Sequence, residues 1–154
     1  MSLRIYDSLS RSLVDFTPRD PGKVTIYACG LTPQAPAHLG HMRGAVLFDV
    51  VRNWLEYNGL EVDFVQNFTD IDDKIIRRSA EEGISASEVA EKYGARYLKD
   101  LDLLGVRPAR WVYVTKNMAA IIEMISTIIE RGHAYEVEGD VYFRVLSLKD
   151  YGKL

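Results

Sequence analysis

The chain of 154 residues has little cysteine and no excess of positive charge. A single cysteine, Cys29, excludes a disulfide framework and leaves no second thiol for a closed structural zinc site. A formal net charge of −3 excludes a global basic field for nucleic acid, so such contacts would need local patches such as Arg77-Arg78. No apolar run approaches the ~20 residues of a membrane span, and the amino terminus lacks the long apolar stretch of a signal peptide. These absences favour a cytoplasmic protein without a membrane contact.

The hydrophobic pattern predicts an α/β fold. Alternating or clustered apolar residues predict strands at 3–6, 24–29 and 61–66, and helical spacing predicts helices at 39–57, from about 73 to 82, 85–104 and 117–131. Residues 133–137 and 140–145 flank Glu138-Gly139 as a hairpin. The strand–helix–strand succession over residues 24–66 predicts a parallel βαβ unit. The remaining segments leave the sheet, so we expect only part of a doubly wound sheet, in a truncated chain.

A thiol and two imidazoles stand where the second predicted strand passes into the first long helix. Cys29 ends the strand beside Gly30, and His38 and His41 flank Gly40 at the helix start. Open α/β sheets bind ligands outside the carboxyl ends of their strands, which makes this junction the predicted site. The imidazoles suit phosphate oxygens at a helix amino terminus, although capping or surface histidines are the alternative. The thiol is open to three interpretations: a metal ligand, a nucleophile or a small buried hydrophobic group.

A polar and acidic turn follows the next strand and faces the same crevice. Asn67 and Thr69 offer neutral hydrogen bonds to a ligand, and Asp70, Asp72 and Asp73 offer carboxylates. Carboxylates at this point suit a ligand ammonium or ribose hydroxyls. The alternative is that Asp70 or Asp72 caps the following helix, with acid in its first turn.

Several motifs in register carry a resemblance over essentially the whole chain. They are Tyr27-Ala28-Cys29-Gly30, His38-Leu39-Gly40-His41, Phe48-Asp49-Val50, the run Asn67-Phe68-Thr69-Asp70-Ile71-Asp72-Asp73-Lys74-Ile75, Gly139-Asp140-Val141-Tyr142-Phe143 and Asp150-Tyr151-Gly152-Lys153-Leu154. In this order and spacing they resemble the amino-terminal part of cysteinyl-tRNA synthetase. The resemblance implies a class I synthetase with a Rossmann-type parallel sheet, of which residues 1–105 are the first half. Residues 106–154 would begin a helical and hairpin connective region.

The resemblance also implies an activity. Such enzymes activate L-cysteine with ATP and Mg²⁺ to cysteinyl-adenylate and transfer it to tRNA(Cys) in protein synthesis, and we expect a monomer. Catalytic roles fall to His38 and His41, which with Gly40 would bind ATP phosphates. The family zinc, which takes the substrate thiolate, would have Cys29 as one ligand, and a soft thiolate binds zinc far better than a serine hydroxyl does. The implied cysteinyl-adenylate pocket comprises Cys29, Gly30, Leu31, Thr32, Asn67, Phe68 and Thr69.

Parts of the family pattern do not occur in these residues. The remaining zinc ligands, the lysine-rich ATP loop, the second half of the sheet and the anticodon-binding region have no counterpart. We therefore expect a truncated chain that does not catalyse aminoacylation by itself. Three other hypotheses stay open: a cysteine:glucosaminyl-inositol ligase of mycothiol synthesis, a non-catalytic nucleotide-binding half-domain, and an α/β domain in which every motif is a cap or core residue.

Overall fold

The computed structural model describes residues 3–153, and the chain divides into two compact units. One unit comprises residues 18–117, and the other combines residues up to 17 with those from 118 onward. Within the described residues, no helix combines the length and the apolar character that crossing a membrane requires.

A three-stranded parallel sheet forms the centre of the unit 18–117. Its strands are β3 (Lys23–Ala28), β4 (Glu61–Phe68) and β5 (Arg110–Tyr113), in the order β3-β4-β5. Ala28 pairs with Gln66, and Phe68 pairs with Tyr113, so the carboxyl ends of the strands lie at one edge of the sheet. The parallel order confirms the predicted α/β, Rossmann-type sheet.

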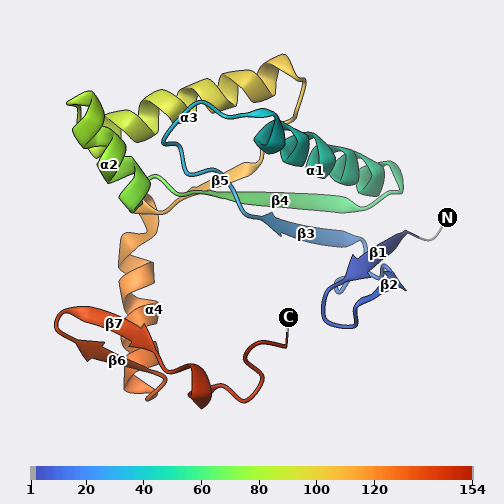
Figure 1. Ribbon diagram of the computed structural model, residues 1–154. Coiled ribbons are helices and arrows are strands. Elements are labelled where there is room, and N and C mark those ends of the chain that lie inside the picture. Colours follow the sequence, from blue (N-terminus) through green and yellow to red (C-terminus); the bar gives the residue numbers. More distant parts are fainter. Residues whose placement is uncertain (1–2, 154) are drawn as a thin grey trace. The chain divides into compact units, whose positions relative to one another are not determined.

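Three helices accompany this sheet, namely α1 (Leu39–Tyr57), α2 (Asp73–Glu82) and α3 (Ala86–Leu103). Helices α1 and α3 run along the same face of the sheet (Figure 1). Their apolar faces meet it in a core that contains Ala45, Phe68, Tyr97 and Leu101, with Trp111 packed against them. Burial of these apolar and aromatic groups stabilises the unit and holds the carboxyl edge of the sheet in place.

Local sequence signals explain where the helices begin and end. Ser85 and Glu88 cap α3 reciprocally, as their spacing predicts. Gly83 ends α2 with a φ of 67°, a left-handed conformation that costs glycine little. Asn58 is the carboxyl cap of α1. The predicted bounds of α1 and the predicted end of α2 are therefore confirmed.

The second unit is built from two hairpins and a helix. Strands β1 (Arg4–Asp7) and β2 (Ser12–Asp15) pair antiparallel, and so do β6 (Ala134–Val137) and β7 (Asp140–Phe143). Glu138 and Gly139 have φ values of 52° and 91°, the left-handed pair that a two-residue hairpin turn requires. Helix α4 (Met118–Glu130) lies beside the second hairpin, which confirms both predicted elements.

Two strands escaped the sequence analysis. No strand was predicted between residues 6 and 24, but residues 12–15 form β2 against β1. Strand β5 was also missed, because its four residues are too few to show a period. It belongs to the sheet although the predicted boundary at residue 105 placed it in the connective region. The division into residues 1–105 and 106–154 itself stays a prediction.

Candidate functional site

A small cavity lies where the carboxyl end of β3 meets the start of α1. Its volume is about 160 Å³, which corresponds to roughly five water molecules at ~30 Å³ each. The cavity is thus the size of an amino-acid-like group rather than of a nucleotide. Its lining residues come from the β3 end, α1, β4 and α3: Cys29, Gly30, Leu31, Gly40, His41, Gly44, Ala45, Phe48, Gln66 and Tyr97.

The structure brings together part of the predicted site. Cys29, Gly30, Leu31, Gly40 and His41 line this cavity, whereas His38, Thr32, Asn67, Phe68 and Thr69 are not among its lining residues. Cys29 is exposed, so its thiol is not a small hydrophobic group in the core. Thiol and imidazole therefore meet at one cavity, as the sequence analysis expected. The roles assigned to them stay predictions.

Gly30 makes a close backbone crossing beside the cavity. A Cβ atom at this position would meet the Asn67 carbonyl oxygen at 1.6 Å, a distance that no side chain tolerates. Only glycine allows the chain leaving β3 to pass so near the end of β4. The crossing is closed by a backbone hydrogen bond from the Thr69 N–H to the Leu31 carbonyl oxygen, at 3.1 Å.

The Asn67 side chain fastens the same crossing. Its Oδ1 accepts hydrogen bonds from the Gly30 N–H at 2.7 Å and from the Tyr27 hydroxyl at 3.1 Å. Its Nδ2 donates to Thr69 Oγ1 at 2.9 Å. Three of its four hydrogen-bonding positions are thus occupied by the protein. Asn67 holds the Cys29–Gly30 backbone instead of facing the cavity.

The two histidines of the predicted motif cap α1 in an unusual way. His38 Nδ1 accepts from the Gly40 N–H at 3.1 Å, and His41 Nδ1 accepts from the His38 N–H at 3.2 Å. Their ring centroids lie 3.9 Å apart, with a 30° angle between the planes. Because each Nδ1 is an acceptor, each neutral ring carries its proton on Nε2. The pair therefore offers two Nε2–H donors beside the positive end of the α1 dipole.

The electrostatic surroundings favour the uncharged form of His41. Partial burial lowers the pKa of His41 below its ordinary value, and the neighbouring His38 lowers it further. A protonated His41 would also lose the Nδ1 lone pair that accepts the His38 N–H. Capping and ligand binding are consequently compatible here, since the caps use Nδ1 and leave Nε2 free.

The aspartates of the acidic turn after β4 have separate structural roles. Asp72 caps α2 by accepting from the Lys74 N–H at 2.8 Å, and Asp73 lies in the first helical turn. Asp70 accepts from the Thr115 N–H at 3.0 Å and from the Thr115 hydroxyl. It therefore ties the end of β4 to the short helix η1 (Thr115–Asn117). The geometry thus supports the alternative interpretation of Asp72, as a helix cap and not as a ligand contact.

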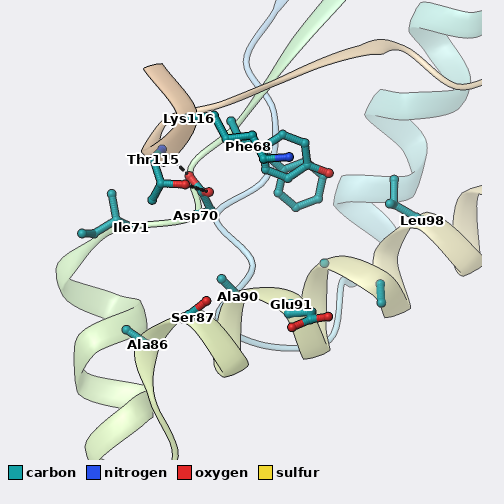
Figure 2. A pocket seen from close by; sticks show the side chains of 13 residues that line it. Phe68, Asp70, Ile71, Ala86, Ser87, Ala90, Glu91, Leu98, Thr115 and Lys116 are labelled. Atoms are coloured by element: carbon teal, nitrogen blue, oxygen red, sulfur yellow. Dashed lines mark hydrogen bonds between the residues drawn. The ribbon is translucent and has the colours of Figure 1, made fainter. Parts of the chain in front are cut away.

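A larger cavity of about 600 Å³ opens between α3 and the ends of β4 and β5 (Figure 2). The Asp70–Thr115 contact lies at its rim, and Ala86 and Ala90 approach it from α3. Among the residues that the sequence analysis considered for the site, Phe68 and Asp70 line it. Its volume suits a small ligand, but its walls are mostly apolar and it holds none of the predicted thiol or imidazole chemistry.

The described residues provide an incomplete set of ligands for the zinc ion that the resemblance implies. Within residues 3–153, no group of three or more histidine, cysteine, aspartate or glutamate side chains is placed to hold a metal ion. Cys29 is exposed beside the cavity and is able to give one thiolate. These residues alone do not fit a zinc site.

The sequence analysis overlooked two polar residues of the cavity, Gln66 and Tyr97. Gln66 is 6% exposed and Tyr97 is 4% exposed. Burial raises the pKa of the Tyr97 hydroxyl, which therefore stays protonated at neutral pH. A hydrophobic strand around Gln66 and an apolar helical stripe around Tyr97 gave no sign of a binding role. The informative signal was the glutamine itself, a polar residue at a core-facing strand position.

A protein-family model matches residues 15–154 of the chain. Its description reads "tRNA synthetases class I (C) catalytic domain". The match spans most of both units and includes the β3 end, the α1 start and the turn after β4.

Curated relatives are similar over the whole chain. The cysteine–tRNA ligase of Carboxydothermus hydrogenoformans is 53% identical over 153 residues, which are 99% of this chain and 33% of that protein. The cysteine–tRNA ligase of Aquifex aeolicus is 50% identical over 155 residues, covering 100% of this chain and 31% of that protein. The chain thus spans about a third of the length of these relatives.

Solved structures show the same fold at low sequence identity. The Mycobacterium tuberculosis methionyl-tRNA synthetase in complex with methionyl-adenylate is 17% identical, with a TM-score of 0.66 over 72% of this chain and 23% of that chain. The LeuRS of Agrobacterium radiobacter, in a ternary complex with tRNA and LeuAMS, is 15% identical, with a TM-score of 0.65 over 77% of this chain and 16% of that chain.

Proposed function

The chain belongs to the family of class I tRNA synthetase (C) catalytic domains, and we propose that it is part of an ATP-dependent cysteine–tRNA ligase. The intact protein would activate L-cysteine to cysteinyl-adenylate and transfer it to tRNA(Cys). One observation carries the proposal: Cys29 and His41 line a single cavity of amino-acid size at the carboxyl edge of the sheet. We also propose that it works in the cytoplasm as a monomer.

The proposed roles at the α1 start rest on the free Nε2–H groups. His38 and His41 would donate to ATP phosphate oxygens, and the bare Gly40 would let phosphate approach the helix amino terminus. Negative charge accumulates on these oxygens when the cysteine carboxylate attacks the α-phosphate and pyrophosphate leaves. Donors that are already fixed in place stabilise that charge without reorganising, and Mg²⁺ would neutralise part of it.

The proposed amino-acid end of the site lies at the β3 end. Cys29, with Gly30, Leu31 and Thr32, would surround the substrate side chain, while Asn67, Phe68 and Thr69 would form the wall behind it. Asn67 supports this arrangement indirectly, by fixing the backbone that carries Cys29. Cys29 would give one thiolate to a zinc ion, and further ligands would be needed besides the residues described here. Bound zinc favours a soft thiolate over a serine hydroxyl.

Cysteine-dependent exchange between ATP and pyrophosphate tests the proposed activity in the intact protein. We expect exchange with cysteine and, after addition of tRNA(Cys), acylated tRNA. The 154-residue chain alone should show neither, because it spans about a third of its relatives. An intact protein that charges glucosaminyl-inositol instead of tRNA would overturn the proposal. The comparisons do not favour that alternative, since the relatives named above are cysteine–tRNA ligases.

A further inference from the structure

The loop of residues 31–38, between β3 and α1, connects the two ends of the proposed site. It follows Cys29 and Gly30, carries Thr32 and ends at His38, and none of its residues belongs to a helix or a strand. A segment without its own ladder of backbone hydrogen bonds keeps one conformation only if neighbouring elements hold it. The contacts of this loop therefore decide how firmly both ends of the site are placed.

Two contacts hold the middle of the loop against α2 and α3. Pro33 is fully buried, and a Cβ added to Gly94 of α3 would lie 4.0 Å from the Pro33 Cβ. Arg78 of α2 donates from Nε to the Gln34 carbonyl oxygen at 3.1 Å, although the two residues are 44 positions apart. Among residues 3–153, this is the one hydrogen bond that a side chain gives to residues 32–37.

The guanidinium of Arg78 is itself fixed by acidic side chains of α2. Its Nη1 donates to Glu81 at 3.1 Å, and its Nε lies 3.6 Å from Glu82 Oε1. Glu82 is held in turn by α3, because it accepts hydrogen bonds from Lys92 and from the Tyr93 hydroxyl. These bonds lower the pKa of Glu82, so its carboxylate stays ionised beside Arg78. The donor that reaches the loop is thus held in a fixed orientation.

The neighbouring arginine has different surroundings. Arg77 is exposed, and within residues 3–153 its side chain takes part in no hydrogen bond or salt bridge. The sequence analysis considered Arg77-Arg78 as a local basic patch, but the guanidinium of Arg78 is committed to the loop and to two carboxylates. The pair therefore offers a natural comparison between an arginine that contacts the loop and one that does not.

We propose that Arg78 is a positioning residue for cysteine activation, which acts through the Gln34 carbonyl on the loop that carries Thr32 and leads to His38. The inference rests on the proposed function. Arg78 does not line the 160 Å³ cavity, so it is not a catalytic residue. Its effect comes from order: a loop that is already held places its groups without reorganising when charge develops in the transition state.

The test measures ATP–pyrophosphate exchange by the intact protein. Arg78→Met removes the donor and keeps much of the apolar stem, and we expect kcat to fall about tenfold, as for loss of one charge-assisted hydrogen bond. The KM values for ATP and cysteine should change little, because the loss concerns the transition state more than substrate binding. Arg78→Lys keeps a cationic donor and should show a smaller fall in kcat.

Hydrogen exchange of the same proteins supplies a readout besides activity. The peptide that contains residues 32–37 should exchange faster in Arg78→Met, and to a smaller extent in Arg78→Lys. Arg77→Met is the matched control, since it removes an identical side chain one position away that does not contact the loop. We expect this control to leave kcat and the exchange of residues 32–37 unchanged.

The outcomes separate the inference from the proposed function. A lower Tm with an unchanged kcat per folded protein would make Arg78 a purely structural residue and overturn the inference. An equal fall of kcat in Arg77→Met, or a raised KM as the only effect, would also overturn it. If Arg78→Met does not fold, Arg78→Lys decides: an unchanged kcat and unchanged exchange of residues 32–37 overturn the inference. Absence of cysteine-dependent exchange in the unaltered protein would overturn the proposed function as well.

Discussion

Asn67 Oδ1 lies 2.7 Å from the Gly30 nitrogen and joins the carboxyl ends of two neighbouring strands. The bond spans 37 positions of sequence and fixes the residue that follows Cys29. The same asparagine also receives the Tyr27 hydroxyl and donates to Thr69. The position of the Cys29 thiol is thus a consequence of one side chain on the adjacent strand.

Removal of the Asn67 side chain should loosen the β3 end. Asn67→Ala leaves the Gly30 N–H without its partner, and we expect a loss of ~1–3 kcal/mol in the free energy of unfolding. Hydrogen exchange of the intact protein should speed up in the peptide that contains Gly30. Asn67→Asp keeps an acceptor for Gly30 and should retain most of the protection. Asn53→Ala is the control, because the exposed Asn53 side chain donates to Asp49 within α1, away from the crossing. Unchanged exchange in Asn67→Ala would show that the bond does not hold the crossing.

Gly30→Ala should be strongly destabilising. Its methyl group would stand 1.6 Å from the Asn67 carbonyl oxygen, so the two strand ends must separate. Gly44→Ala on α1 is the matched control, since a Cβ there meets no atom within 4 Å. Alanine in a helix is favoured over glycine by up to ~1 kcal/mol. Thermal unfolding should therefore show a lower Tm for the first variant and an equal or higher Tm for the second. Similar Tm values for both variants would contradict the crowded crossing.

The activity should fall in mildly acidic solution. The pKa of His41 lies below its ordinary value of about 6.5, so the unfolded chain takes up this proton more readily than the folded one. Its contribution to stability is present above about pH 6.5 and is lost as the pH falls through the folded-state pKa. Protonation also ends the Nδ1 contact with the His38 N–H.

The measurement is the rate of ATP–pyrophosphate exchange by the intact protein between pH 7.5 and 5.5. We expect a decrease towards the acidic end, and a weaker pH dependence in His41→Gln at a lower overall rate. His133→Gln, which alters a histidine of the other unit, should keep the original profile. A His41→Gln profile that matches the unaltered protein would show that another group is responsible.

The hydrogen bonds between Asp70 and Thr115 should stabilise the fold without contributing to ligand binding. Asp70→Asn and Thr115→Val, made separately and together, form a double-mutant cycle in the free energy of unfolding. We expect a coupling energy of about 1 kcal/mol, because the two residues share hydrogen bonds at the rim of the sheet. The KM for ATP and for cysteine should stay unchanged in the single variants. Additive effects on stability together with a raised KM would instead give Asp70 a role in ligand binding.

The sequence was sufficient for most elements with strong local signals. The helical period of residues 39–57, the Ser85–Glu88 spacing and the Glu138-Gly139 turn each depend on neighbours in the chain, and all three were predicted correctly. Strands β2 and β5 have four residues each. β2 pairs with β1, its neighbour in the chain, whereas β5 pairs with the distant strand β4. Periodicity does not reveal strands as short as these.

The site residues likewise fall into those that the sequence revealed and those that only the folded structure shows. Cys29 and His41 were visible because thiol and imidazole chemistry stands out in a sequence, and the strand–helix order placed them together. Gln66 and Tyr97 were missed, since only the folded chain brings an amide from β4 and a hydroxyl from α3 to one cavity. Asn67 was predicted as a ligand contact, yet its side chain bonds Tyr27, Gly30 and Thr69, which only the folded crossing at Gly30 reveals.

The most direct test of the account replaces the thiol that ends β3. In the intact protein, Cys29→Ser keeps the approximate size of the residue but removes the sulfur atom proposed to lie beside the substrate side chain. We predict that cysteine-dependent ATP–pyrophosphate exchange falls about 100-fold or more, with the KM for ATP unchanged. Exchange that continues at the rate of the unaltered protein would contradict the central claim that Cys29 belongs to the site of cysteine activation.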